Sequence, residues 1–358
     1  MANKDNIEIS IAKAIGIILM VLGHSGIQSF VHDFIYMFHM PLFFLLSGYL
    51  FKEKYLTDAN TFIRRRIKTL YFPFVIWSVL FLLLHNLFFD INIYNLKYGY
   101  TGGVPRYSSV DIWHHFLDIV TKMQGSDELL GTFWFLKALF FGSLISYFAL
   151  KICPKPFVCI IILTPLFILS SHFRIWIPYI IVGALECYSA ILFLLGFWYK
   201  KSGYHLEQKW WCACLGLFSV IIGTLYWPGE ITGIGTRKLI PYTTSAIGGS
   251  LMVLFISHLT TNANTQKIKN SLIYIGNNTM IVLVLHFLSF KLVSLIIIKL
   301  YGLSIDRLAE FPIIKEYATQ GWWILYLIVG VGIPIGIKLI WQELSSKIQV
   351  FLNIKGIK

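Results

Sequence analysis

The sequence has few charged residues. Only 13% of its 358 residues are Asp, Glu, Lys or Arg, whereas 57% are hydrophobic, and the mean hydropathy is +0.71. Soluble globular domains carry about 25% charged residues, so this composition excludes an ordinary soluble domain. The chain is long enough for about ten membrane-spanning helices of roughly 20 residues each, joined by short connections. We therefore expect an all-α, polytopic integral membrane protein that forms one domain over residues 1–358.

Cysteine is also scarce, and the short motifs of common catalytic folds are missing. The five cysteines lie in or beside apolar runs. Their odd number gives no disulfide framework, and Cys212-Ala213-Cys214 is one residue short of a CxxC motif. We expect free, buried thiols. The sequence contains no GxSxG, P-loop, GxGxxG or HExxH pattern, so any chemistry must come from residues outside these motifs.

Acidic residues are outnumbered, with 17 Asp and Glu against 30 Lys and Arg, a net charge of +13. The positions of the basic residues explain this excess. If the N-terminus is cytoplasmic, the cytoplasmic connections hold 18 Lys and Arg and the opposite connections hold 9. This bias follows the positive-inside rule. It predicts that both termini are cytoplasmic, and it requires no nucleic-acid partner.

Ten apolar segments have the length and composition of membrane spans. Segment 272–299 is long for a bilayer, so we expect it to tilt or to extend beyond the membrane. The ten segments cover residues 9–28, 34–51, 71–89, 130–150, 156–172, 176–199, 210–227, 239–259, 272–299 and 321–341.

The longest outside connection, residues 90–128, contains acidic and histidine side chains at helical spacing. They lie in VDIWHHFLDIV, where two histidines are adjacent. Adjacent residues point to different faces of a helix, so we interpret this segment as a solvated amphipathic helix and expect no metal. The side chains concerned are Asp111, His114, His115 and Asp118.

The first two spans form an apolar hairpin with costly polar residues. The first arm, IAKAIGIILMVLGHSG, places Lys13 and His24 eleven positions apart, which is close to three helical turns. Both therefore lie on one helix face, roughly 16 Å apart along the axis. His39 lies at a similar depth to His24 on the second arm, FIYMFHMPLFFLLSGYLF, where an interhelical hydrogen bond is the competing interpretation. Imidazoles transfer protons near neutral pH, so Lys13, His24 and His39 are candidate catalytic residues.

A basic segment, NTFIRRRIK, follows the hairpin on the expected cytoplasmic side. Its cations are Arg64, Arg65, Arg66 and Lys68. One interpretation is an interfacial helix on anionic headgroups of membrane lipids. The other is a site for the phosphates of a soluble ligand, because arginine binds phosphate bidentately. Both interpretations can hold together.

Four further side chains near the expected outer surface are candidate substrate-binding residues. Trp134 is either an interfacial belt residue or a platform for sugar stacking. Lys137 is an intramembrane charge, and His286 lies in the outer half of the ninth span. Ser25 follows His24 and, with Gly26, is small enough to leave room for a substrate. Other intramembrane polar groups are Glu186, which we place mid-span, Lys291, and the pair Ser47-Gly48, which we interpret as a helix-packing site.

These residues resemble a known family. The Lys-x10-His of AKAIGIILMVLGH, FHMPLFFLLSGYLF, RRRIKTLYFPF, GTFWFL and IGNNTMIVLVLHF are similar to acyltransferase family 3, specifically its fucose-4-O-acetylase-like branch. The resemblance covers essentially the whole chain. It implies a ten-helix enzyme of the bacterial inner membrane that takes an acyl group, usually from cytoplasmic acetyl-CoA, to a hydroxyl of an extracytoplasmic or lipid-linked glycan such as O-antigen or capsule.

The resemblance also assigns residues. The catalytic histidine of the family corresponds to His24, its basic partner to Lys13, and its arginine motif to Arg64, Arg65 and Arg66. Relatives often have Asp where Ser10 stands, which removes any orienting carboxylate there. We expect His24 either to act as general base on the sugar hydroxyl or to carry the acyl group transiently. The competing hypotheses are a transporter of a lipid-linked sugar or a proton-coupled carrier, and the same fold with another donor such as succinyl-CoA.

Overall fold

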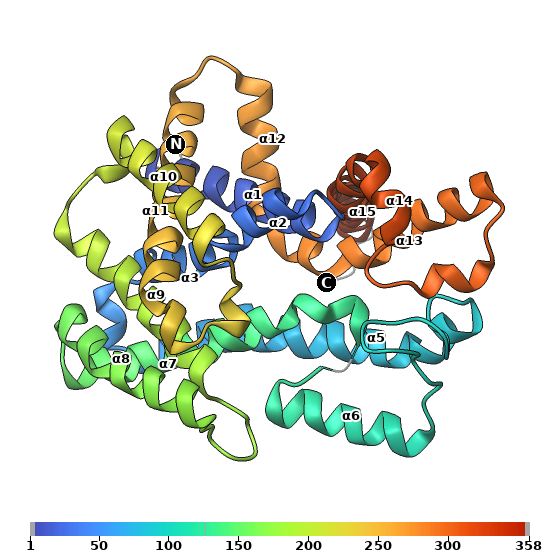
Figure 1. The fold of residues 1–358 in the computed structure, drawn as a ribbon, viewed down its shortest axis with the longest axis horizontal. Coiled ribbons are helices and arrows are strands. Elements are labelled where there is room, and N and C mark those ends of the chain that lie inside the picture. Colours follow the sequence, from blue (N-terminus) through green and yellow to red (C-terminus); the bar gives the residue numbers. More distant parts are fainter. Residues whose placement is uncertain (1–3, 126, 355–358) are drawn as a thin grey trace.

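The computed structural model is a bundle of helices (Figure 1). It describes residues 4–125 and 127–354. Within these residues the one strand-like pairing is an isolated bridge between Ile177 and Val182. The α-helices are α1 Lys4–His24, α2 Ser29–Tyr36, α3 His39–Tyr49, α4 Ala59–Arg66, α5 Phe72–Asp90, α6 Ser109–Lys122, α7 Trp134–Ile152, α8 Pro156–Phe173, α9 Ala184–Ser202, α10 Trp210–Tyr226, α11 Leu239–Asn262, α12 Gln266–Asn277, α13 Thr279–Tyr301, α14 Lys315–Tyr317 and α15 Trp323–Ile354.

Short helical segments join or extend these helices. The 3-10 turns are η1 Glu53–Leu56, η3 Glu128–Phe133, η4 Leu206–Gln208, η5 Ile231–Gly233, η6 Thr236–Lys238 and η7 Ile305–Ala309. The π-helical turns are η2 Ile67–Tyr71 and η8 Ala318–Trp322.

The helices confirm an all-α, multi-pass membrane protein. Within the described residues, eight helical stretches are long and apolar enough to cross a membrane, and α10 is apolar but shorter. A tenth helix, α9, occupies the place of the expected sixth span. Every expected span therefore has a helix, although several differ from the expected boundaries.

Three of the expected spans have wrong boundaries or an unexpected break. The sixth does not begin at residue 176, because a turn precedes α9 and the helix begins at Ala184. The second is two helices, α2 and α3, since Phe38 leaves the helical conformation with φ −143°. The ninth is interrupted at Asn278, which separates α12 from α13. This break explains why the apolar run is longer than one bilayer crossing.

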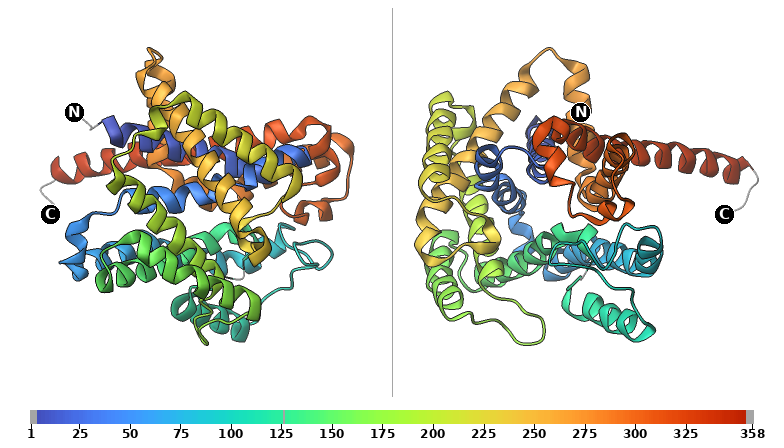
Figure 2. Two further views of the ribbon diagram at one scale, coloured as in Figure 1. Left: turned by 60° about the vertical axis from the view of Figure 1, so that its left-hand side comes forward. Right: turned by 45° about the vertical axis from the view of Figure 1, so that its right-hand side comes forward.

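Of the eight candidate spans within the described residues, the one formed by α13 is the most buried and the one that contains α15 is the least buried. Of the apolar window of α13, 67% is buried, against 17% for the window over residues 315–347. Figure 2 shows the C-terminal part of α15 extending away from the other helices. Polar groups on α13 are therefore surrounded by protein, which makes that helix the natural carrier of a buried site.

The close approach of α3 and α9 depends on two glycines. A Cβ atom on Gly48 would lie 1.8 Å from the carbonyl oxygen of Phe193, and one on Gly196 would lie 1.9 Å from that of Leu45. No side chain fits at either position, so the two backbones pack directly. The expected helix-packing role is confirmed for Gly48.

The described residues of the connection after α5 are tied to that helix. The helix α6 of this connection begins with a capping box between Ser108 and Asp111 and confirms the expected amphipathic helix. His85 hydrogen-bonds the carbonyl oxygen of Pro105 at 3.0 Å. Burial raises the pKa of Tyr94 well above its ordinary value, and the Tyr94 hydroxyl donates to Asp127 at 2.5 Å. These contacts hold the outer loop against the bundle.

Candidate active site

The imidazole of His24 lies at the C-terminal end of α1, in contact with three rings. Its Nδ1 atom is 3.1 Å from the hydroxyl oxygen of Tyr36. Its ring centroid is 5.7 Å from that of His286, in a stacked arrangement, and 5.0 Å from that of Phe287. Within the described residues the Nε2 atom has no hydrogen-bond partner. The side chain is thus oriented through one nitrogen and leaves the other available to a ligand.

His286 is fully buried beside His24, and its tautomer follows from its contacts. Its Nδ1 atom lies 3.1 Å from the carbonyl oxygens of both Val282 and Leu283. Because carbonyl oxygens only accept hydrogen bonds, Nδ1 must carry the proton. The Nε2 atom is then a bare acceptor, and it is buried without a partner in the described part of the chain. Such an unsatisfied acceptor is suited to receive a hydroxyl group.

His39 joins the same centre through Tyr36. The ring centroids of Tyr36 and His39 are 4.9 Å apart, and Nδ1 of His39 donates to the carbonyl oxygen of Ile35 at 2.8 Å. The hairpin therefore brings its two histidines together, with the Tyr36 ring contacting both. On the outer side, His32 stacks on Tyr36 with centroids 3.9 Å apart.

The turn after His24 leaves less room than the sequence suggests. Ser25 is fully buried, and its hydroxyl donates to the carbonyl oxygen of Leu22 at 2.7 Å. Gly26 adopts φ +85°, and a Cβ atom there would lie 2.4 Å from Ile313 and 2.6 Å from Ala318. The space beside Gly26 is thus filled by Ile313 and Ala318, and the substrate role predicted for Ser25 stays a prediction.

An apolar cavity of about 210 Å³ leads from Lys13 towards this centre. Lys13, Ser47 and Leu283 line it, together with hydrophobic side chains from α1, α3, α7 and α13. Its wall reaches the histidines because the carbonyl oxygen of Leu283 accepts from His286. Lys13 itself has no ion-pair or hydrogen-bond partner among the described residues. We call this space the inner cavity.

Arg66 contacts the inner cavity through its lining residue Ser47, and we call the region around Ser47 the mouth of the cavity. Its guanidinium donates to Ser47 at 3.1 Å and lies over the rings of Phe62 and Phe193, 5.1 and 5.5 Å from their centroids. Its Nε atom is buried and unpaired, and no carboxylate pairs with it in the described residues. A buried guanidinium without a counterion is costly. This geometry favours an anionic ligand at the mouth. Ser47 therefore contributes a hydrogen bond here, beyond the packing role expected for it.

The other basic residues of this segment point elsewhere. Arg65 donates to the hydroxyl of Tyr55 at 2.7 Å, and Arg64 and Lys68 are exposed. The π-helical turn η2, which begins at Ile67, continues α4 into α5. Of the four predicted cations, Arg66 therefore faces inward, and the other three form an exposed basic surface around it.

A second space opens on the other side of the histidines. It has a volume of about 570 Å³ and is lined by Tyr98, Gly99, Arg307, Glu310, Phe311, Ile313, Lys315 and Glu316. The ring of Phe311 is 4.8 Å from that of Phe287, centroid to centroid, and Phe287 in turn contacts His24. We call this space the outer pocket. His24 and His286 thus lie between the inner cavity and the outer pocket.

Two predicted substrate-binding residues lie on another face of α7. Phe135, Leu136 and Leu139 form the face that lines the inner cavity. Trp134 packs edge-on against Phe135, and Lys137 lies within electrostatic range of Glu186. The structure does not bring Trp134 or Lys137 into contact with His24, so their predicted roles remain predictions.

Two buried ionisable groups stabilise helix ends and loops. Glu186 is not mid-span but in the first turn of α9, where its carboxylate accepts from the backbone N–H of Gly183 at 2.8 Å. Lys291 donates to the carbonyl oxygens of Leu308 and Glu310 at 2.9 and 2.8 Å. This clamp holds the wall of the outer pocket on α13. Similarly, Ser10 hydrogen-bonds Asn277 at 2.9 Å and joins α1 to α12.

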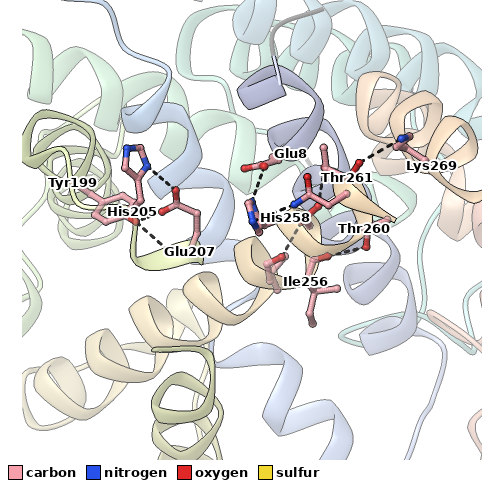
Figure 3. Close-up of polar contacts among 12 residues, drawn as sticks. Glu8, Tyr199, His205, Glu207, Ile256, His258, Thr260, Thr261 and Lys269 are labelled. Carbon is pink, nitrogen blue, oxygen red and sulfur yellow. Dashed lines mark hydrogen bonds and ion pairs between the residues drawn. The ribbon is translucent and has the colours of Figure 1, made fainter. Parts of the chain in front are cut away.

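A separate polar cluster lies near the N-terminal end of α1. Figure 3 shows Glu8 beside His258, and Glu207 in contact with both His205 and Tyr199. These groups satisfy one another at the rim of an apolar cavity of about 190 Å³. The cluster connects α1 to α11 and η4 to α9, and we assign it a structural role.

Sequence reasoning missed Tyr36, Phe287 and the outer pocket. Tyr36 lies three residues before His39 and Phe287 directly follows His286, so both stood beside predicted residues. A polar side chain one turn from an intramembrane histidine was the available signal for Tyr36. Residues 98 and 307 are far apart in the chain, and no local pattern joins them.

Fold and site together define a multi-pass membrane protein with a histidine centre between two cavities. A family model described as Acyltransferase domain matches residues 6–339, nearly the whole chain. The chain therefore belongs to acyltransferase family 3 and is an acyltransferase.

The comparison with curated proteins gives one partial match, and the comparison with solved structures gives none. The chain is 30% identical over 150 residues to the Nodulation protein NolL of Mesorhizobium japonicum (strain LMG 29417 / CECT 9101 / MAFF 303099). The match covers 38% of this chain and 34% of the relative, so the chain spans about a third of the length of that relative. No solved structure matches.

Proposed function

We propose that this acyltransferase moves an acetyl group from acetyl-CoA to a hydroxyl of a cell-surface or lipid-linked glycan, in the bacterial inner membrane. The observation that carries this proposal is Arg66, a half-buried guanidinium with a buried, unpaired Nε atom and no carboxylate partner among the described residues, at the mouth of the inner cavity. CoA supplies the phosphates that such a group binds. The exposed Arg64 and Lys68 add positive charge around the mouth.

The inner cavity suits the remainder of the donor. Its walls are apolar, apart from Lys13, Ser47 and Thr279, and they include Leu283, whose carbonyl oxygen accepts from His286. A pantetheine arm has a length comparable to the roughly 16 Å between Lys13 and His24 along a helix. With the phosphates at Arg66, the thioester would enter this cavity and approach the histidines. Lys13 can then interact with the donor inside the cavity.

The chemistry requires one base at the reacting hydroxyl. In direct transfer, Nε2 of His24 takes the hydroxyl proton as the oxygen attacks the thioester carbonyl, and the C–S bond breaks to release CoA thiolate, which is then protonated. In the alternative, Nε2 attacks the thioester carbonyl first, and the C–S bond breaks to release CoA thiolate. The sugar oxygen then attacks the acetyl carbonyl, the C–N bond to Nε2 breaks, and the hydroxyl proton passes to the released imidazole and on to the thiolate. In both, Tyr36 orients His24 through Nδ1, and the bare Nε2 of His286 can accept from the sugar hydroxyl.

The test is acetyl transfer in membranes from expressing cells. We expect radiolabel from acetyl-CoA to enter surface glycan with the wild type and to fall at least a hundredfold with His24→Ala, because general bases contribute 10²–10⁴-fold. The matched control is His114→Ala, an exposed histidine of α6. Equal labelling by wild type and His24→Ala would remove His24 from the mechanism. Labelling from succinyl-CoA but not from acetyl-CoA would change the donor. Movement of a lipid-linked sugar across the membrane, with no radiolabel entering the glycan, would favour a transporter.

A further inference from the structure

The apolar cavity of about 190 Å³ beside the polar cluster of Figure 3 lies between α3, α9 and α11. Most of its wall consists of leucine and isoleucine side chains, such as Leu42, Leu195 and Leu251. Beyond one end of it, the hydroxyl oxygens of Tyr188 and Thr243 lie 2.8 Å apart and join α9 to α11. We call this space the lateral cavity.

The walls of the lateral cavity suit a hydrocarbon chain. Apolar cavities of about 150 Å³ stay dry and accept hydrocarbon ligands. Trp198 lines the lateral cavity and is itself 39% exposed, so a chain can enter from the surface of α9. Because α9 occupies the place of an expected span, that surface faces the acyl chains of a bilayer.

Two carboxylates lie at the polar end of the lateral cavity. The side chains of Glu8 and Glu207 both line it, and they are only 13% and 11% exposed. Glu8 accepts a hydrogen bond from His258 at 2.9 Å, and Glu207 accepts from His205 at 3.1 Å and from the hydroxyl of Tyr199. In the part of the chain that the structure describes, no Lys or Arg pairs with either carboxylate. Their hydrogen bonds are satisfied, but no fixed positive charge balances them.

The tautomer of His258 leaves the charge of Glu8 uncompensated. Its Nδ1 atom donates to Glu8, because a carboxylate only accepts. Its Nε2 atom lies 3.2 Å from the amide nitrogen of Asn262, which only donates, so Nε2 carries no proton. An imidazole with one donor and one acceptor nitrogen is neutral. A largely buried carboxylate without a positive partner is costly, and a cationic ligand would offset that cost.

The lateral cavity shares one wall residue with the inner cavity. Leu46 of α3 lines both spaces, and the next residue, Ser47, hydrogen-bonds Arg66. A chain in the lateral cavity therefore packs against the helix that forms a wall of the inner cavity.

We propose that the lateral cavity binds an aminophospholipid, with one acyl chain between α9 and α11 and the primary ammonium group of the lipid at the carboxylates of Glu8 and Glu207. A primary ammonium group combines a positive charge with three N–H donors. A quaternary ammonium group has the charge but no N–H donor, and a glycerol headgroup has hydroxyl donors but no positive charge. The site is therefore selective for the amine. This proposal does not depend on the reaction that the protein catalyses.

Native mass spectrometry of the full-length, delipidated protein in detergent tests the headgroup. The probes are dioleoyl phosphatidylethanolamine, phosphatidylcholine and phosphatidylglycerol, which have identical chains. We expect the ethanolamine lipid to bind at least about tenfold more tightly than the other two, because only it can form charge-assisted hydrogen bonds to the carboxylates. Glu8→Gln combined with Glu207→Gln should reduce this preference to about twofold or less. The matched control is Glu53→Gln, an exposed carboxylate that pairs with Lys201 outside the cavity and should leave the preference unchanged.

A second pair of variants tests where the chain lies. Leu251→Trp fills the lateral cavity, so it should weaken binding of the ethanolamine lipid at least about fivefold. Leu259→Trp, at an exposed position of the same helix, should leave it unchanged.

Several outcomes would overturn the proposal. Equal binding of the three lipids to the wild type would indicate annular lipid only, and tighter binding of the glycerol lipid would indicate an anionic ligand. A preference that survives the double substitution, or equal binding by Leu251→Trp and Leu259→Trp, would remove the carboxylates or the cavity from the site. If the double variant does not fold, Glu207→Gln alone replaces it, and Leu251→Phe replaces Leu251→Trp. The comparison of lipids on the wild type needs no variant.

Discussion

The inner cavity and the outer pocket differ in how their charges are compensated. At the mouth of the inner cavity, Arg66 has a hydroxyl and two aromatic rings for partners, and Lys13 within the cavity has no ion-pair partner among the described residues. In the outer pocket, Arg307 has two carboxylate partners. The inner cavity is mostly apolar, whereas the outer pocket is rich in polar side chains.

The difference in charge compensation predicts which kind of ligand each space binds. An uncompensated buried cation raises the free energy of the empty protein and is stabilised when an anion arrives. A compensated ion pair gains little from an anion but offers donors and acceptors to hydroxyl groups. The inner cavity approaches His286 through Leu283, and the outer pocket approaches His24 through Phe311 and Phe287. On the proposed function, this difference in charge compensation predicts that the donor phosphates bind beside the inner cavity and not in the outer pocket.

The largest effect is expected from a substitution of Arg66 beside the inner cavity. Arg66→Gln removes the charge but keeps a polar side chain. We expect the KM for acetyl-CoA to rise about 10–100-fold, because a hydrogen bond to a charged group is worth about 1.5–3 kcal/mol. Steady-state kinetics with purified protein measure it. The control is Arg64→Gln on the exposed surface, for which we expect about a twofold change. Equal effects of the two variants would contradict an inward-facing phosphate site.

A smaller effect addresses the histidine centre between the two spaces. Tyr36→Phe removes the hydroxyl next to Nδ1 of His24. We expect kcat to fall about 3–10-fold with the KM for both substrates nearly unchanged, because one neutral hydrogen bond contributes about 0.5–1.5 kcal/mol. Tyr226→Phe, at an exposed tyrosine, is the matched control. A rise in KM without a change in kcat would indicate that Tyr36 binds substrate and does not orient the histidine.

The dependence of the two KM values on salt also distinguishes the inner cavity from the outer pocket. Raising ionic strength from about 0.05 M to about 0.5 M shortens the Debye length several-fold and screens exposed charges such as Arg64 and Lys68. We expect the KM for acetyl-CoA to rise severalfold and the KM for a neutral glycan acceptor to stay constant. The measurement is a pair of substrate titrations at each salt concentration. An equal response of the two KM values would show that charge does not distinguish the sides.

The smallest effect concerns the helix that carries the arginines. Asp58 accepts from the backbone N–H of Thr61 and caps α4. These hydrogen bonds lower the pKa of its carboxyl, so capping is present above the unfolded pKa and is lost as the pH falls through the folded pKa. We expect Asp58→Ala to raise the KM for acetyl-CoA about twofold at pH 7, with no further change towards acidic pH. Asp58→Asn, which can still cap the helix, should restore the wild-type KM at pH 7.

The sequence predicted those parts of the site that depend on helical period. The sequence predicted that Lys13 and His24 share a face of α1; in the structure Lys13 lines the inner cavity and His24 stacks on His286 at the end of α1. His39 was predicted at the depth of His24, and Tyr36 does connect the two. Most spans were also predictable, because apolar length decides whether a segment crosses a bilayer.

The rest depends on contacts that no local pattern records. Which of three consecutive arginines faces inward depends on the π-helical turn after Arg66 and on the position of Ser47. The break at Phe38 separates α2, which carries Tyr36, from α3, although the sequence of the two helices looks like one apolar run. The outer pocket joins loops more than two hundred residues apart. Glu186 looked like an intramembrane charge because the turn before α9 is itself apolar.

One helix fixes the spacing of the whole path. On α13, Thr279 and Leu283 line the inner cavity, His286 and Phe287 stand at the centre, and Lys291 anchors the wall of the outer pocket. From residue 279 to 291 the backbone rises roughly 18 Å. A single-residue insertion within this stretch would turn the residues after it by about 100°. The side chains at the inner cavity, at the histidines and at the outer pocket would then no longer be aligned. The number of residues between Thr279 and Lys291 therefore fixes the distance from the inner cavity to the wall of the outer pocket, whichever apolar side chains lie between them.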